Sequence, residues 1–225
     1  MNSIQIITGQ YSAADTAQRA LIDALWGSSA ARYFELYFHR FNVIHELGHA
    51  IMIYNQPDRP HPAREEQIVN NFAAAFWRHY GEHDSLHTLT RIVERALARL
   101  PAPSQEGYLE YAEKNWGKQD FMTFEHYGWF QFSSAKHALS SDIGLAQALT
   151  HMSAFPVTPP NISSLSITAS ENMAQSVVSE ALRVLRAWGV TLPSEIPVVL
   201  CSDLNCHMLA VNDYNKIRQE LLDRL

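Results

Sequence analysis

A long segment from Ala30 to Tyr54 contains no proline and only one glycine, Gly48, and it constrains the fold more than any other part of the chain. Such a segment permits an uninterrupted helix, which Asn55 and Pro57 then end. At 100° per residue, one face of this helix carries Phe34, Phe38, Phe41, His45, His49 and Met52. We therefore predict a helix over residues 30–54 with two imidazoles in the middle of an apolar stripe.

The centre of this helix, His45-Glu46-Leu47-Gly48-His49, has the form His-Glu-x-x-His. Residues four apart stack on one helical face, so both imidazoles can bind one cation, and Glu46 can reach water beside it. Histidines buried without a partner would cost roughly 1–3 kcal/mol, which coordination offsets. The spacing predicts a metal site, and histidines satisfied by the core are the alternative.

A catalytic zinc ion needs a third protein ligand, with the fourth position left to water. His61 follows His49 by twelve residues, among prolines, and does not complete the longer Gly-x-x-His motif. A second helix is expected from Pro62 to about Tyr80. Its candidate ligands are Glu66 and, about 100° around the helix, Glu65. We predict Glu66, because it shares its face with Val69, Asn70, Ala73 and Trp77.

Two segments resemble the metal-binding helices of the gluzincin metallopeptidases: His45-Glu46-Leu47-Gly48-His49 and Glu66-Gln67-Ile68-Val69-Asn70-Asn71-Phe72-Ala73-Ala74. The second is similar to the Glu-x-x-Ala-Asn-x-Phe-Ala pattern of the compact ImmA/IrrE-type zincins, with Val69 in place of a small residue. The resemblance implies a zincin-like core with one zinc ion per chain, bound by His45, His49 and Glu66. It also implies that Glu46 is the general base and that Asn70 supports the ligands.

The chemistry expected of such a site is hydrolysis of a peptide or other amide bond, with Glu46 accepting a proton from water activated by zinc. The tetrahedral oxyanion then needs a further donor. We predict His126 and Tyr127, from the polar and aromatic segment 125–131, ahead of Tyr108 and Tyr111. The alternative for this segment is an aromatic core helix with its polar members in solvent.

Other functions remain open at this stage. The metal could organise a recognition surface in a regulatory or binding protein that has the zincin fold but no general proteolytic activity. A purely structural zinc site is less favoured, because such sites use four protein ligands and have no need of Glu46. Two histidines and one carboxylate also suit iron and other divalent ions. The expected partner is a peptide or protein substrate, and the oligomeric state is not predicted.

Proline, helical periodicity and short apolar runs divide the chain into a mainly helical part, 1–155, and a small α/β segment, 156–225, packed on it. In the first part we expect a strand over 4–7 and helices over 13–26, 30–54, 62–80, 85–100, 105–116, 120–139 and 143–152. In the second we expect strands over 165–168, 197–201 and 208–211, and helices over 170–188 and 213–225. The expected fold class is α+β.

Composition narrows the range of partners. The 225 residues are 47% apolar, enough for a large core, and the net charge of −6 disfavours nucleic acid as a ligand. No apolar run approaches the roughly 20 residues that cross a membrane, and the first residues do not resemble a secretory signal. We therefore expect a cytoplasmic protein. Its two cysteines, Cys201 and Cys206, are expected to be reduced thiols.

Overall fold

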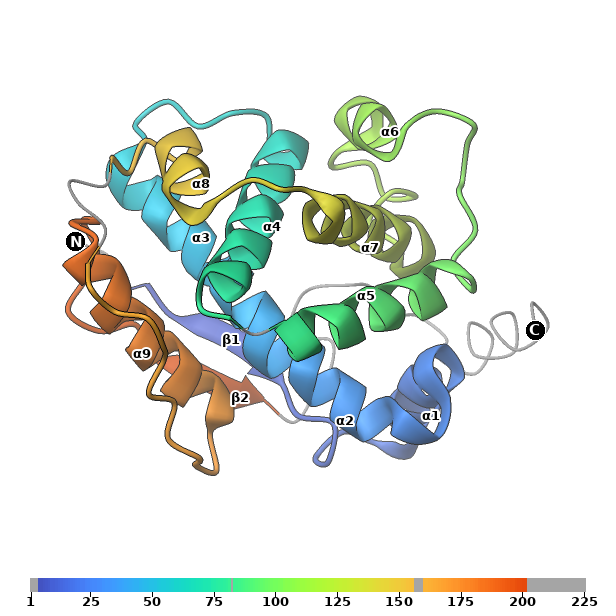
Figure 1. Cartoon of the computed structure of the whole chain (residues 1–225). Helices are drawn as coiled ribbons and strands as arrows, with labels where there is room; N and C mark the ends of the chain where they lie inside the picture. The colour runs from blue at the N-terminus through green and yellow to red at the C-terminus, as the bar shows by residue number, and fades with distance from the viewer. Residues whose placement is uncertain (1–3, 82, 156–159, 202–225) are drawn as a thin grey trace.

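The computed structural model describes residues 4–81, 83–155 and 160–201. Most of these residues are helical, and the two strands form a small parallel sheet, which confirms the α+β class in its coarse form (Figure 1). The strands are β1 (Ile6–Gly9) and β2 (Val198–Cys201). The α-helices are α1 (Thr16–Trp26), α2 (Ala30–Phe34), α3 (Asn42–Asn55), α4 (Pro62–His79), α5 (His83–Leu97), α6 (Tyr108–Asn115), α7 (Phe124–Ser140), α8 (Leu145–His151) and α9 (Met173–Ala187).

The sheet joins the two ends of the described chain. Ile6 lies opposite Val198 and Gly9 opposite Cys201, so β1 and β2 pair in parallel along their whole length. Helix α9 contacts both α3 and β2, and Figure 1 shows it beside the sheet. The segment after residue 160 therefore contributes both a strand and a covering helix to the part of the molecule that holds α3. The division of the chain into parts 1–155 and 156–225 stays a prediction.

Three expectations for the second part of the chain have different outcomes. Residues 165–168 form no strand, because the Ser166 amide donates to the Glu180 carboxylate on α9 (2.7 Å) instead of pairing with another strand. Cys201 takes part in a disulfide, so the expectation of a reduced thiol is wrong there. Cys206, the strand expected over 208–211 and the helix expected over 213–225 lie outside the described residues.

The helix expected over residues 30–54 forms as one continuous run, but its middle is wider than an α-helix. Between α2 and α3 lies the π-helical segment η2, Glu35–Phe41. The i to i+5 hydrogen bonding of a π-helix changes how side chains point around the axis. The single face expected from Phe34 to Met52 is thus divided. Phe41 is wholly buried, whereas Phe38 is half-buried and stacks on Phe34 with ring centroids 4.4 Å apart.

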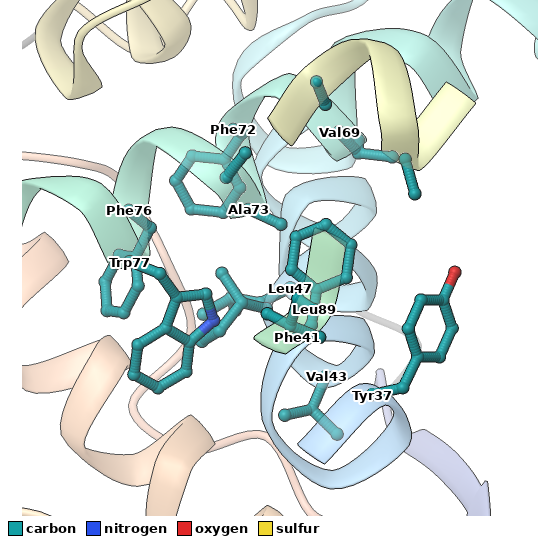
Figure 2. Packing of buried hydrophobic residues seen from close by; sticks show 14 of the residues in the cluster. Tyr37, Phe41, Val43, Leu47, Val69, Phe72, Ala73, Phe76, Trp77 and Leu89 are labelled. Atoms are coloured by element: carbon teal, nitrogen blue, oxygen red, sulfur yellow. The ribbon is translucent and has the colours of Figure 1, made fainter. Parts of the chain in front are cut away.

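Helices α3 and α4 pack closely because α3 has a glycine at their contact. A Cβ atom on Gly48 would lie only 2.9 Å from the Cβ and Cγ1 atoms of Val69 and 3.2 Å from the Phe72 ring. Leu47, Val69 and Phe72 are buried together, and Figure 2 shows side chains of α3 and α4 meeting in this core. The close approach places the histidines of α3 opposite the first turns of α4.

Helix α7 packs across α4 and α5 and completes the helical layer over α3. Its N-terminus is capped by Thr123, whose hydroxyl accepts from the amide of His126. Helix α4 begins at Pro62, as expected, with the His61 ring accepting from the amide of Ala63. None of the described helices has the length and apolar character needed to cross a membrane.

Candidate metal centre

Two histidines of α3 and one carboxylate of α4 converge on a single point. The Nε2 atom of His45 lies 3.1 Å from one oxygen of Glu66, and the Nε2 atom of His49 lies 3.6 Å from the other. One ligand atom from each of the three residues lies within 4.8 Å of the other two. Two imidazole nitrogens and a carboxylate oxygen are a donor set that zinc accepts. The residues predicted as ligands are therefore brought together in a group that could hold one metal ion.

A buried amide supports His45 from behind. The Nδ1 atom of His45 lies 3.0 Å from Oδ1 of Asn70, one turn after Glu66 on α4. Because an amide oxygen only accepts, Nδ1 carries the hydrogen of this bond, which leaves Nε2 as the nitrogen that would bind a metal. The Asn70 amide nitrogen donates in turn to Ser134 Oγ on α7 (2.9 Å), and all three side chains are buried. This arrangement agrees with the supporting role expected for Asn70.

A charged pair supports His49. Its Nδ1 atom lies 2.6 Å from Oε1 of Glu65, and Arg59 Nε donates to the other oxygen of that carboxylate (2.8 Å). A second nitrogen of Arg59 contacts Glu65 Oε1. The alternative ligand Glu65 therefore orients the His49 ring, in the manner of the carboxylates that accept from metal-bound histidines. Both histidines are left with Nε2 directed at Glu66.

The electrostatics of the group follow from this packing. Burial by itself disfavours the Glu66 carboxylate, but hydrogen bonds and charge from His45 and His49 outweigh it and hold the pKa of Glu66 well below its usual range. Burial likewise disfavours the protonated His49 ring, yet its hydrogen bond and Coulombic attraction to Glu66 raise the pKa of His49. The centre is therefore a site built around a stable negative charge.

A cavity of about 340 Å³ opens beside the three predicted ligands. Glu46 lies on its wall, half-buried, and accepts a hydrogen bond from the Asn42 amide one turn earlier (3.3 Å). Glu46 is not one of the three clustered ligands. It lines the cavity as a separate acidic group. The cavity also borders Gly9 of β1, apolar side chains of α1 and aromatic side chains of η2 and α7.

The two predicted oxyanion donors lie in different places. Tyr127 lines the cavity beside the ligands, and its hydroxyl accepts from the Gln131 amide, which also donates to Glu66 (both 2.8 Å). His126 faces a different hollow, with Pro101, Asp120 and Glu125, and contacts the Tyr111 hydroxyl (3.3 Å). The structure thus brings Tyr127 to the ligands and directs His126 elsewhere.

The less favoured tyrosines are also away from the ligands. The Tyr108 hydroxyl donates to Gln67, on the side of α4 that faces α6, and Tyr111 packs against Phe121 and Trp129. Neither lines the cavity that holds the ligand group.

Gln131 and Tyr37 are among the residues of the site that were not singled out from the sequence, as are Asn42, Arg59 and Ser134. Gln131 follows Tyr127 by one helical turn, and this spacing was a usable signal. Tyr37 lines the cavity from η2, and no sequence signal places it there because the π-helical turn sets its direction. Burial, and then the charges of Glu66 and Glu46, raise the pKa of Tyr37, while burial and Glu66 raise that of Tyr127. Both phenols therefore keep their protons and can donate hydrogen bonds.

Comparison of the chain with protein-family models, curated proteins and solved structures found no match.

Proposed function

We propose that the chain is a zinc-dependent metallopeptidase that cleaves peptide or other amide bonds. The observation that carries the proposal is the position of Glu46 on the cavity wall next to three candidate ligands. A structural zinc ion would be enclosed by four protein ligands, whereas catalytic sites keep one position open. Here the described residues supply three ligands, and the cavity lies beside them with an additional carboxylate.

The chain's own side chains can then be assigned to steps. Zinc at this centre would polarise the amide carbonyl and make water more acidic. Glu46 accepts the proton of the attacking water and passes it to the departing amine, while Asn42 holds the carboxylate in place. Tyr127 donates a hydrogen bond from its phenolic hydroxyl to the developing oxyanion. Gln131 fixes both Tyr127 and Glu66 through its two hydrogen bonds.

The proposal is tested by Glu46→Gln in zinc-loaded protein. We expect one zinc ion to stay bound and cleavage of a mixed library of quenched peptides to fall by about 10²–10⁴-fold or more, because general base catalysis is lost. Tyr127→Phe should keep the metal and slow cleavage by about 10²–10³-fold. The matched control is Glu94→Gln, on the exposed face of α5, which should change neither property.

Unchanged turnover in Glu46→Gln would contradict the mechanism. Zinc binding by the wild-type chain with no cleavage of any peptide would contradict the enzymatic proposal and favour the regulatory alternative.

A further inference from the structure

The cavity beside the metal centre has two chemically different ends. At one end lie the ligands and Glu46, together with the neutral phenol of Tyr127. The other end is lined by apolar side chains from α1, α2, η2 and α7, including Leu21, Ile22, Leu25, Phe34, Phe38 and Phe132. The described residues that line the cavity include no lysine and no arginine. A bound molecule therefore meets charge at the metal end and only apolar and amide groups beyond it.

The apolar end lies deep in the molecule. Leu21, Leu25 and Phe34 are buried side chains of the core, yet they border open volume. The cavity volume of about 340 Å³ is far larger than the small voids normal in protein interiors. Its size and lining are those of a ligand pocket.

Aromatic packing holds the pocket wall in shape. Phe38 contacts Phe34 (4.4 Å between ring centroids), Trp26 (6.3 Å) and Tyr37 (5.1 Å). Trp26 is anchored by a hydrogen bond from its Nε1 to the Ile92 carbonyl on α5 (3.2 Å). The wall is therefore preformed, which lowers the entropic cost of binding a ligand.

We infer that this pocket receives a bulky, uncharged apolar side chain adjacent to the amide bond that is cleaved. The substrates are then peptides or amides with an aromatic or large aliphatic group beside the reacting carbonyl. This inference rests on the proposed hydrolytic function and adds its substrate class. An anionic side chain is disfavoured because the carboxylates of Glu46 and Glu66 would repel it. A cationic side chain is disfavoured because the apolar end offers no group of opposite charge.

The test uses zinc-loaded full-length protein and two hydroxamates, acetohydroxamate and 3-phenylpropanohydroxamate. A hydroxamate chelates the metal whether or not hydrolysis occurs, so the difference in affinity between the two compounds reports on the pocket alone. Full burial of an apolar group predicts that the phenyl compound binds about 10- to 100-fold more tightly. Succinic monohydroxamate, whose substituent is anionic, should bind no more tightly than acetohydroxamate.

Two variants locate the effect in the pocket. Leu21→Phe adds volume at the apolar end and should reduce the preference for the phenyl compound to within about threefold, while Phe38→Ala should widen the pocket and favour still larger substituents. The control, Ile53→Phe, lies at an exposed position on α3 and should leave the preference unchanged. Retention of one zinc ion establishes that each variant is folded at the metal centre, and Phe38→Ala supplies the test if Leu21→Phe fails to fold.

The outcomes separate this inference from the proposed function. Equal affinity for the two neutral hydroxamates, or a preference that neither pocket variant alters, overturns the inference, even if peptides are cleaved. A preference for the phenyl compound without cleavage of any peptide overturns the hydrolytic function and supports the apolar pocket. A preference for the phenyl compound together with cleavage of peptides next to aromatic or large aliphatic residues supports both the apolar pocket and the hydrolytic function.

Discussion

His45 and His49 occupy successive turns of the same helix, yet the protein supports them in different ways. His45 is buried and bonds to the neutral pair Asn70 and Ser134. His49 is more exposed, with 22% of its side chain accessible, and bonds to Glu65, which is paired with the charged Arg59. Both arrangements turn Nε2 toward Glu66.

The difference follows from whether a cation can reach the supporting group. A charged carboxylate behind His45 would have to be desolvated in the core, whereas an amide there satisfies Nδ1 without an added charge. Glu65 is itself buried, with 5% of its side chain accessible, but Arg59 reaches it from the surface and offsets the cost of holding that carboxylate against His49. One geometric requirement on two imidazoles is thus met by neutral hydrogen bonds at His45 and by an ion pair at His49.

The largest expected effect on the free energy of unfolding comes from removing the metal that both histidines would bind. With zinc present at about 1,000 times its dissociation constant, binding adds about 4 kcal/mol to the free energy of unfolding. A chelator should remove this increment in denaturant titrations of the wild-type chain. The same chelator should leave Glu66→Ala unaffected, and equal stability of the wild-type chain with and without chelator would contradict the account.

Gly48→Ala should disturb both histidines at once, because it separates α3 from α4. Glycine inside a helix is normally about 0.5–1 kcal/mol worse than alanine. Here the new Cβ would meet Val69 at 2.9 Å, and overpacking of roughly 1–3 kcal/mol should make the substitution destabilising and weaken zinc binding. Thermal unfolding and zinc titration measure the two effects.

The control for this substitution is Gly107→Ala, where a Cβ meets nothing within 4 Å; the loss of a good N-cap residue should cost about 0.5–1 kcal/mol and leave zinc binding unchanged. A Gly48→Ala protein more stable than the wild type would show that the close helix approach is absent.

Asn70→Ala and Glu65→Gln separate the two kinds of support. Each should weaken zinc binding by about 10- to 100-fold, because each loosens one imidazole. Asn70→Ala should also cost about 1–3 kcal/mol of metal-free stability, since it leaves buried polar groups of His45 and Ser134 unpaired. Glu65→Gln keeps the shape of the side chain and one acceptor oxygen for His49, and should cost less. The comparison fails if the metal-free variants are equally stable.

The smallest effect is expected from Arg59→Ala. Arg59 contacts Glu65 but is 39% exposed, so its contribution is at most about 1 kcal/mol, or about fivefold in zinc affinity. Salt screens such a pair, so the difference from the wild type should shrink at 1 M salt. Ser134→Ala, at the neutral support of His45, should change zinc affinity by an amount that does not depend on salt.

The parts of this molecule that sequence predicted well depend on local periodicity. Helices α3 and α4, and the placement of His45, His49 and Glu66 on facing sides, follow from spacings within single helices. The start of α4 at Pro62 follows from the preference of proline for the first helical turn. Such features need no knowledge of how distant segments pack.

The parts that sequence did not predict depend on packing between elements. His126 and Tyr127 are neighbours on α7, and the docking of α7 on α4 decides which one faces the ligands. Glu65 was weighed only as a ligand, because its role needs Arg59 from the preceding loop to be in place. The π-helical turn that directs Tyr37 into the cavity has no pattern of its own in the sequence.

Zinc content per chain at saturating zinc measures whether His45, His49 and Glu66 hold one metal ion. We predict one tightly bound zinc ion in the wild-type chain and in Glu65→Gln, and none in Glu66→Ala. A wild-type chain without zinc, or a Glu66→Ala chain that keeps it with the same affinity, would contradict the account.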